Sequence, residues 1–340
     1  MKIPKARKLK SGNWFIWLRL GGQNIPITAA TETECKNAAL RIKTDYITQH
    51  KRPAVKADMT LHQVCEAYIE QYRPVLSPST IRGYMICLRN RFAAYQNMPL
   101  GKIPWQKMIN DELRNYSEKT VKNAWGLVHA SLKLADYPIP TVKLAATPVR
   151  EIAFLQPDEI LAFVDAVKGR SYEIPALLAL NGLRVSEIRG LQWEHIDFKQ
   201  NVIRVRGALI PSDTGYVRRQ ANKTDSSTRD VPILIPQLKD ALKAARKPTG
   251  AIVDIAAVNI LRDVKRACNR AGVTEVTTHG LRHSFASLGY YLKIPERQLM
   301  LWGGWRDYQV MHKIYIRVAA VAEQKSRSTV EAFFDKTITV

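Results

Sequence analysis

The sequence predicts a multidomain protein with three successive parts: a small α+β N-terminal domain, an all-α domain, and a mixed α/β, mainly helical C-terminal domain. A chain of 340 residues is too long for one ordinary domain and suits two or three, each with its own core. The spacing of apolar residues changes near residue 59 and again after a proline-punctuated stretch that ends near residue 148. These changes mark the expected domain boundaries.

The N-terminal domain is expected in residues 1–56. Two runs rich in aromatic and β-branched residues, 14–20 and 24–28, flank a Gly-Gly pair and are typical of a small sheet. Apolar residues recur at near-helical spacing over residues 31–50, which predicts one helix packed on the sheet. The basic segment 51–56 contains a proline and is typical of a linker.

The second domain, expected in residues 59–148, has the apolar spacing of helices. Apolar residues repeat at i, i+3, i+4 and i+7 from Leu61, and a second helix is expected from about Ser79. Ser117 is a suitable N-cap for a third helix, which ends before the prolines at 138 and 140. We expect a unit of four or five helices.

The third domain, expected in residues 153–326, mixes helical and extended patterns. Pro157 lies in the first turn of a helix and acidic residues follow it, as a helix N-terminus favours. Helices are expected around residues 158–167, 172–181 and 256–271, and strands at 202–205, near Val217 and at 231–235. Residues 327–340 combine an amphipathic stretch with a short β-like end and form a C-terminal tail.

Composition excludes several classes of protein. No apolar run approaches the roughly 18 residues that a membrane helix needs, and the start of the chain lacks the apolar stretch of a secretion signal. The four cysteines are scattered and none belongs to a C-x-x-C pair, which argues against a zinc site and a disulfide framework. We therefore expect a soluble, cytoplasmic protein without a membrane partner.

The charge of the chain points to a polyanionic partner. The formal net charge is +22, and so basic a surface repels itself unless a polyanion neutralises it. Nucleic acid is the first candidate. The alternative is a solvated basic surface without a specific partner.

Two motifs in the third domain place cations where they could hold an anion. Arg184 stands at a glycine-marked helix junction, and Glu187 follows one turn later, so the carboxylate could aim the guanidinium. His279 and Arg282 share one face of a helix start, as a phosphate or oxyanion site needs. Taken alone, the first motif is better explained by an ordinary surface ion pair, and the second is compatible with a histidine at a helix cap.

Three further residues are informative only in combination. Lys223 precedes a strand and could reach a ligand from a hairpin, although most lysines in so basic a chain have no such role. Trp305 follows a Gly-Gly pair, and Tyr315 lies in an apolar setting further on. A lone tyrosine in an apolar helix is usually a core residue.

Taken in chain order, these motifs resemble the tyrosine recombinase family, which includes phage integrases, chromosome-dimer resolvases and Cre-like enzymes. The family pattern is an arginine in a G-L-R-x-S-E box, a hairpin lysine, an H-x-x-R box, a histidine or tryptophan, and a tyrosine. All five elements occur in order within residues 155–318. Carried over residue by residue, the resemblance gives this candidate catalytic set: Arg184, Lys223, His279, Arg282, Trp305 and Tyr315.

The interval before the tyrosine departs from the family pattern. The family usually places its tyrosine nine residues after the histidine or tryptophan, whereas Tyr315 lies ten residues after Trp305. This implies one extra residue between Arg306 and His312, or it leaves Tyr308 as an alternative nucleophile. The Ile-Tyr-Ile-Arg-Val setting of Tyr315 resembles the family's tyrosine helix and favours that residue.

The resemblance implies that DNA strands are cleaved and rejoined through a 3′-phosphotyrosine link, with no cofactor and no metal. The two arginines of the set would stabilise charge on the phosphate, and its histidine and tryptophan would add hydrogen bonds there. Tyr315 would be the nucleophile, and Lys223 would protonate the leaving 5′-oxygen. Glu187 would orient Arg184 without being catalytic itself.

The resemblance also implies partners. Residues 59–148 resemble a core-binding domain that clamps duplex DNA together with the catalytic domain, and residues 1–56 resemble an arm-binding domain that reads an accessory DNA site. Four strand cuts imply a homotetramer on double-stranded DNA, and DNA-bending host factors are left open as partners. In the family, tails like residues 327–340 often dock on a neighbouring protomer, and packing within the same protomer is the alternative. The implied role is integration or excision of a mobile element, such as a viral genome.

Three other functions compete with recombination. A type IB topoisomerase shares the tyrosine and arginine chemistry but relaxes supercoils as a monomer. A DNA-binding regulator would keep the fold with a silent site, and the intact set of six catalytic positions argues against it. A basic RNA-binding protein would cleave nothing.

Overall fold

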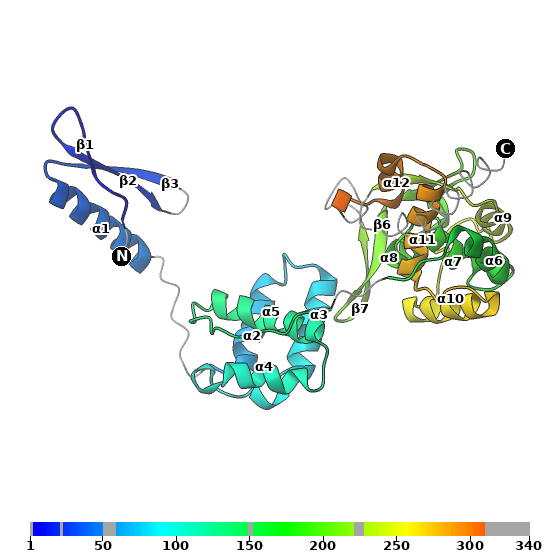
Figure 1. The fold of residues 1–340 in the computed structure, drawn as a ribbon, viewed down its shortest axis with the longest axis horizontal. Coiled ribbons are helices and arrows are strands. Elements are labelled where there is room, and N and C mark those ends of the chain that lie inside the picture. The colour runs from blue at the N-terminus through cyan, green and yellow to red at the C-terminus, as the bar shows by residue number, and fades with distance from the viewer. Residues whose placement is uncertain (1–2, 21–22, 50–58, 149–151, 221–227, 310–340) are drawn as a thin grey trace, which may run out of the picture. The chain divides into compact units, whose positions relative to one another are not determined.

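The protein was analysed as a computed structural model, which describes residues 3–20, 23–49, 59–148, 152–220 and 228–309. The chain divides into two compact units, residues 1–76 with 83–147 and residues 77–82 with 148–340. The described residues are mostly helical, with small antiparallel sheets (Figure 1).

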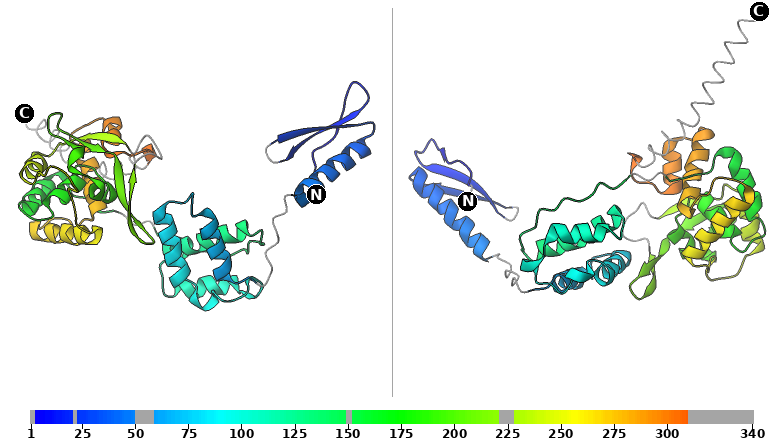
Figure 2. Two further views of the ribbon diagram at one scale, coloured as in Figure 1. Left: turned by 180° about the vertical axis from the view of Figure 1, so that it is seen from behind. Right: turned by 60° about the horizontal axis from the view of Figure 1, so that its bottom comes forward.

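The N-terminal part is a three-stranded antiparallel sheet with one helix packed on it. Its strands lie in the order β1 (Arg7–Lys8), β2 (Trp14–Leu20) and β3 (Gln23–Ala29), and α1 (Glu32–Gln49) covers one face (Figures 1 and 2). Ile16 and Leu18 alternate along β2 and point to the face that α1 covers, where Cys35 and Ala39 are also buried. The apolar pattern predicts β2, β3 and α1, whereas β1 is too short to give a pattern of its own.

The other face of this sheet carries aromatic and basic side chains. Trp17 is 53% exposed, and its ring meets the Phe15 ring edge-on, with centroids 5.2 Å apart. Arg19 is exposed on the same face, and Arg7 of β1 lies opposite Phe15 in the register. The period of two thus separates an apolar core face from a basic, aromatic outer face.

The next part of the chain is a bundle of helices. Its α-helices are α2 (Leu61–Tyr72), α3 (Pro78–Asn90), α4 (Trp105–Leu113) and α5 (Glu118–Leu134), and its 3-10 turns are η1 (Ala93–Tyr95) and η2 (Leu100–Lys102). Thr60 caps α2 by accepting a hydrogen bond from the Gln63 N–H, and Ser117 caps α5 as its sequence position predicts. Helices α2 and α5 pack against each other through the apolar faces that the sequence spacing predicts.

The second unit is built around two buried helices. The helices are α6 (Pro157–Val167), α7 (Glu173–Leu180), α8 (Val185–Gly190), α9 (Pro236–Ala244), α10 (Ala257–Ala271), α11 (Thr278–Tyr291) and α12 (Glu296–Gly303), with the 3-10 turn η3 (Trp193–His195). Residues 175–180 of α7 are buried, as is most of α11, and these two helices pack on each other. A polar contact strengthens this core, because the Leu155 N–H donates to the buried Ser284 hydroxyl over 2.8 Å.

Two small sheets lie beside these helices. Strands β4 (Ile196–Asp197), β5 (Val202–Val205) and β8 (Arg229–Pro232) form one antiparallel sheet, and β6 (Gly207–Ser212) pairs with β7 (Gly215–Gln220) as a hairpin. The hairpin extends from the body of the unit (Figures 1 and 2). The sequence predicts β5 and β7, but of β8 only Val231 and Pro232, because this strand runs from Arg229 to Pro232 rather than over residues 231–235. Strand β6 is not predicted by the sequence.

Gly190 allows the hairpin to approach α8. A Cβ atom at Gly190 would lie 2.8 Å from the Ala208 Cα atom, which is closer than real Cβ contacts come. Arg218 of β7 donates to the Gly190 carbonyl over 2.6 Å, and the Arg189 guanidinium lies over the Tyr216 ring. The glycine at the end of α8 is therefore a requirement of packing.

Candidate active site

Arg184 lies at the junction between α7 and α8. Gly182, at the end of α7, has φ of +95°, and a Cβ atom there would lie 3.0 Å from the Phe285 ring, so glycine is needed for this turn. The turn delivers Arg184, whose Nη2 donates to the Gly304 carbonyl over 2.7 Å and whose Nη1 donates to Glu187 over 2.7 Å. Its guanidinium is partly exposed and held at a fixed place.

Glu187 is the buried anion of the site. Its carboxylate accepts the Arg184 N–H at 2.9 Å as well as the Arg184 guanidinium, and its side chain is 7% exposed. Burial acts to raise the pKa of this carboxyl, but the hydrogen bonds and charge of Arg229, together with Arg184, outweigh burial and lower the pKa to about 2. Glu187 is therefore ionised at neutral pH and orients Arg184, as expected from the sequence.

Arg229 is a site residue that the motifs did not identify. It begins β8, and its Nη1 and Nη2 donate to the two oxygens of Glu187 over 3.1 and 2.9 Å. Its Nε donates to the Trp302 carbonyl at the end of α12 over 2.8 Å. A signal existed in the sequence, since the period of two in β8 places Arg229 on the same face as the fully buried Val231.

Arg282 lies on α11 and is 1% exposed. Its Nη1 donates to the Gly182 carbonyl, but Nε and Nη2 have no hydrogen-bond partner within the described part of the chain. Burial, and then the charge of Arg184, lower the pKa of this guanidinium to about 9. A buried cation with two unused donors is costly by itself, and an anion held against those donors would offset the cost.

Trp305 covers the Arg282 guanidinium. The Arg282 Cζ atom lies 4.1 Å from the centroid of the Trp305 ring, and this ring stacks on Phe285 with centroids 6.3 Å apart and planes at 11°. The close turn before it requires small residues. A Cβ atom at Gly303 would overlap the Trp305 ring, and Gly304 has φ of +66°.

His279 lies in the first turn of α11, after the N-cap Thr277. Its ring meets the His283 ring edge-on, with centroids 4.7 Å apart. Burial lowers the pKa of His279, and the charges of Arg282 and Arg184 lower it further. The imidazole is therefore neutral at neutral pH. It lies close enough to Arg282 and Arg184 for their charges to affect its pKa.

The structure thus brings together four of the six sequence-predicted site residues: Arg184, His279, Arg282 and Trp305. Lys223, Tyr315 and the tail 327–340 lie outside the described residues.

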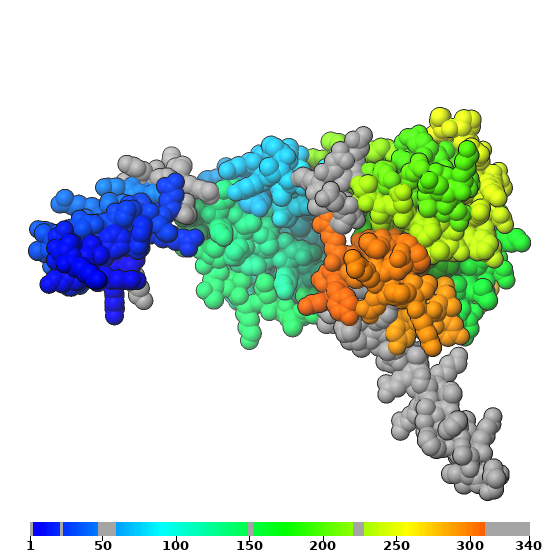
Figure 3. All heavy atoms as spheres, turned by 90° about the horizontal axis from the view of Figure 1, so that it is seen from above, coloured from blue at the N-terminus to red at the C-terminus, as the bar shows by residue number. Residues whose placement is uncertain are grey.

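Tyr308, the alternative nucleophile, is 52% exposed and follows α12 at the surface of the second unit, where Figure 3 shows this segment in orange. A hydrogen bond to Glu296, and then the charge of that carboxylate, raise the pKa of the Tyr308 hydroxyl. This environment stabilises the neutral phenol, whereas a nucleophile needs a phenol that gives up its proton.

Within the described part of the chain, the positive charge at this site comes from guanidinium groups. Among the residues that the structure describes, no group of three or more His, Cys, Asp or Glu side chains is placed to hold a metal ion. Over the same residues, no helix is long and apolar enough to span a membrane.

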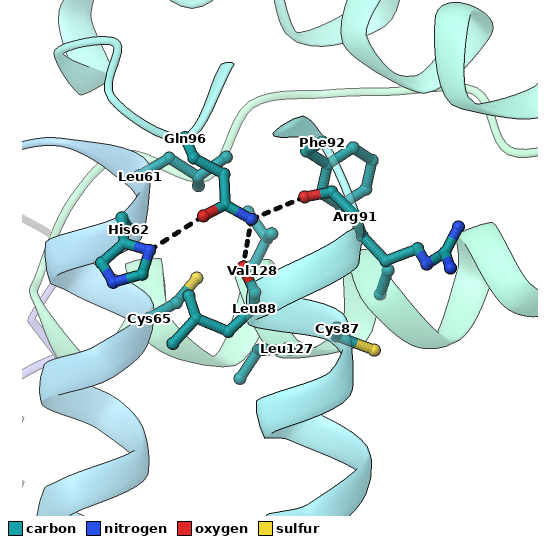
Figure 4. Close-up of a pocket in the computed structure, with 11 residues that line it drawn as sticks. Leu61, His62, Cys65, Cys87, Leu88, Arg91, Phe92, Gln96, Leu127 and Val128 are labelled. Atoms are coloured by element: carbon teal, nitrogen blue, oxygen red, sulfur yellow. Dashed lines mark hydrogen bonds between the residues drawn. The ribbon is translucent and has the colours of Figure 1, made fainter. Parts of the chain in front are cut away.

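A small pocket in the helical bundle offers no comparable chemistry. It has an empty volume of about 260 Å³ and is lined mainly by apolar side chains of α2, α3 and α5 (Figure 4). Both polar atoms of the Gln96 amide are paired, because Oε1 accepts a hydrogen bond from His62 Nδ1 at 2.8 Å and Nε2 donates to two main-chain carbonyls. Burial raises the pKa of the Cys65 thiol to about 12, so that this group is unreactive.

Comparison with known proteins places the second unit in a family. Residues 153–321 match the model of the phage integrase family. A tyrosine recombinase XerC-like protein of Caldanaerobacter subterraneus is 29% identical over 209 residues, which are 52% of this chain and 53% of that protein. The integrase of Staphylococcus phage L54a is 23% identical over 328 residues, which are 80% of this chain and 93% of that protein.

Solved structures show the same fold. An integrase of the transposon Tn1549, in complex with transposon right-end DNA, aligns with a TM-score of 0.62 over 78% of this chain and 99% of that chain, at 18% identity. A lambda integrase tetramer bound to a Holliday junction aligns with a TM-score of 0.55 over 89% of this chain and 96% of that chain, also at 18% identity.

Proposed function

Because this chain belongs to the phage integrase family of tyrosine recombinases, we propose that it is a site-specific DNA recombinase, which cleaves and rejoins DNA strands through a 3′-phosphotyrosine intermediate. The observation that carries the proposal is the buried guanidinium of Arg282, whose Nε and Nη2 have no partner among the described residues. Beside Arg184, these donors form a site for the phosphodiester.

Each residue of the site has a role in the proposed reaction. The Tyr315 oxygen attacks the phosphorus, the P–O5′ bond breaks, and the departing 5′-oxygen takes a proton from Lys223. Arg184 and Arg282 stabilise the charge on the non-bridging oxygens. Because the new ester conserves the energy of the broken one, a free 5′-hydroxyl can reverse the step, and the reaction needs no cofactor and no metal.

His279 and Trp305 complete the phosphate site. The neutral imidazole of His279 can accept the proton of the attacking phenol or donate a hydrogen bond to a phosphate oxygen. The indole N–H of Trp305 is a donor only, so it stabilises the phosphate without taking part in proton transfer.

We propose double-stranded DNA as the partner, with further copies of this chain. The lambda integrase is a tetramer on a Holliday junction in the structure compared above, and recombination of two duplexes requires four cuts, which supports a homotetramer. Residues 59–148 are the proposed core-binding domain, and residues 327–340 are the proposed tail that docks on a neighbouring protomer. DNA-bending host factors would shape the attachment site, and the reaction would take place in the cytoplasm on a mobile element such as a phage genome.

The N-terminal sheet is the proposed arm-binding domain, residues 1–56. Its outer face presents Trp17, Arg19 and Arg7, which supply cations for phosphates and an aromatic surface for bases or sugars. The +22 charge of the chain is consistent with DNA binding.

Incubation with a nicked suicide substrate tests the proposed function. Such a substrate loses its 5′-hydroxyl fragment after cleavage, so religation fails and the enzyme stays linked to DNA. We expect a DNA-linked band on a denaturing gel. Its absence on every duplex that the protein binds would support a silent regulator, and relaxation of supercoils by the monomer would support a topoisomerase.

A further inference from the structure

We propose that Arg229 is a positioning residue for strand cleavage: it fixes the place of Arg184 relative to Trp305 by binding the end of α12 and the Glu187 carboxylate together. The inference rests on the proposed function, since its readout includes DNA cleavage. The position of Trp305 in the free protein tests the same role without cleavage.

The contacts of Arg229 join separate elements. From the start of β8 it donates two parallel hydrogen bonds to Glu187 on α8, over 3.1 and 2.9 Å. Its third donor, Nε, binds the Trp302 carbonyl at the end of α12 over 2.8 Å. One side chain therefore joins β8, α8 and α12, three segments that are far apart in the sequence.

A second set of contacts closes the connection. Glu187 holds Arg184 through both its N–H and its Nη1, and the Nη2 of Arg184 binds the Gly304 carbonyl over 2.7 Å. The two arginines thus hold one carboxylate and the carbonyl end of one helix, where the helix dipole places partial negative charge. If Arg229 is removed, Arg184 keeps Glu187, but the Trp302 carbonyl at the end of α12 loses the hydrogen bond from Arg229.

The geometry demands a guanidinium rather than any cation. The Arg229 side chain is 8% exposed, and it uses a parallel pair of donors for the carboxylate and a third donor, on the other edge of the group, for the carbonyl. A lysine at this position would keep the charge but would lack the planar fork. The Arg229 guanidinium also packs closely against Gly304, because a Cβ atom at Gly304 would lie 2.9 Å from the Arg229 Cζ atom.

The consequence concerns the phosphate site. Trp305 directly follows the anchored turn, and its ring covers Arg282 at 4.1 Å. A small shift of the end of α12 would move this ring and the Gly304 carbonyl that holds Arg184. A misplacement on the order of 1 Å can reduce a rate by about 10²-fold, even where binding is unchanged.

The test compares Arg229→Lys and Arg229→Gln with the wild-type chain at saturating suicide substrate. Arg91→Lys is the matched control, because Arg91 forms a partly buried ion pair with Glu112 in the first unit, with side chains 14% and 11% exposed. We expect both Arg229 variants to cleave about 10²-fold more slowly with DNA affinity within about threefold of wild type. Cleavage within about twofold of wild type, or a loss confined to affinity, would overturn the proposal.

The pH profile separates positioning from general destabilisation. In Arg229→Gln, Glu187 loses the hydrogen bonds and the charge of Arg229, which lower its pKa more than Arg184 does, so its pKa rises. Protonation at acidic pH then releases Arg184, and the cleavage rate gains an acidic limb that wild type and Arg91→Lys lack. Parallel profiles for all three proteins would contradict a positioning role.

A measurement on the free protein remains valid even if no DNA is cleaved. The chain has seven tryptophans, and incorporated 5-fluorotryptophan gives each a ¹⁹F signal, of which Trp305→Phe identifies one. We expect the Trp305 signal to move in Arg229→Gln and to stay in place in Arg91→Lys. An unmoved signal in a folded Arg229→Gln protein would overturn the proposal, whatever the cleavage assay gives.

Discussion

The Arg282 guanidinium lies beneath the Trp305 ring, with its Cζ atom 4.1 Å from the ring centroid, and two of its nitrogens have no partner among the described residues. The ring shields one face of the cation, while the free donors remain in the plane of the guanidinium. The two donors are buried and lie on one edge of the guanidinium, in the forked geometry that phosphate favours. We propose that this pair binds a phosphate oxygen of the DNA.

Substitution of Trp305 should separate ring packing from hydrogen bonding. Trp305→Phe keeps an aromatic ring over Arg282 but removes the indole N–H, whereas Trp305→His keeps a ring nitrogen that can donate. We expect Trp305→His to cleave suicide substrate faster than Trp305→Phe, with Trp305→Ala slowest. Loss of one donor to the phosphate should cost about 10²-fold or less in rate. Faster cleavage by Trp305→Phe than by Trp305→His would show that packing alone matters.

His279 should titrate below its ordinary pKa of 6.5 in the free protein and should shift upward when DNA binds. Burial and the two nearby arginines disfavour the imidazolium, and a bound phosphate would partly neutralise those arginines. NMR titration of the His279 ring, identified with His279→Gln, measures both values. A pKa that does not rise on DNA binding would place the phosphate elsewhere.

The same shift predicts the sign of a stability change. Because the folded-state pKa of His279 is lowered, the unfolded chain binds the proton first as the pH falls below 6.5. The contribution of His279 to the free energy of unfolding is present above pH 6.5 and is lost as the pH falls through the folded-state value. Denaturation of wild type and His279→Gln at pH 7.5 and 5.5 should show a smaller decrease for the variant.

Cleavage should persist in excess chelator. Arg184 and Arg282 supply the positive charge that a metal ion gives in many phosphoryl-transfer enzymes. We expect equal yields of the DNA-linked protein with EDTA and with magnesium. A yield that vanishes with EDTA and returns with magnesium would contradict this mechanism.

The secondary structure could be predicted where one periodicity continued over several turns. The long helices and the strands β2 and β3 follow their apolar spacing because each buries one face. Strand β6 gave no such signal, since its residues other than Ser212 are only half-buried and its place depends on the close approach of Gly190. The position of β6 depends on packing between segments that are distant in the sequence. A local sequence pattern carries no information about such packing.

The site could be predicted as far as its motifs extend. Arg184, His279, Arg282 and Trp305 lie together as the resemblance implies, and Glu187 holds Arg184. Arg229 was overlooked because a charged residue at the start of a strand is ordinarily exposed. Its burial depends on the approach of Glu187 and the end of α12, which only the folded chain brings together.

Deletion of residues 1–56 should abolish arm-site binding while cleavage of an isolated core site survives. The outer face of the sheet, with Trp17 and Arg19, would be removed, whereas the second unit would be unchanged. For each phosphate that the truncated protein no longer binds, the salt dependence of binding to full sites should flatten by about 0.9 log units per log unit of salt. Trp17→Ala is the matched point variant, because Trp17 is exposed and its removal leaves the core of the sheet intact.

The measurement compares affinities for core-only and full attachment DNA at two salt concentrations. We expect the truncation and Trp17→Ala to weaken binding to full sites alone. Equal weakening on both substrates would mean that the N-terminal residues only add diffuse positive charge, and it would end the arm-domain proposal.

The central claim is that Tyr315 is the nucleophile and becomes linked to the 3′-phosphate of the cleaved strand. Covalent trapping on a suicide substrate tests this claim most directly. Tyr315→Phe removes only the attacking oxygen, so we expect no DNA-linked band and nearly unchanged DNA affinity. Tyr308→Phe should form the band as wild type does, because the hydrogen bond to Glu296 raises the pKa of the Tyr308 hydroxyl. A band from Tyr315→Phe together with its loss in Tyr308→Phe would contradict the account and assign the nucleophile to Tyr308.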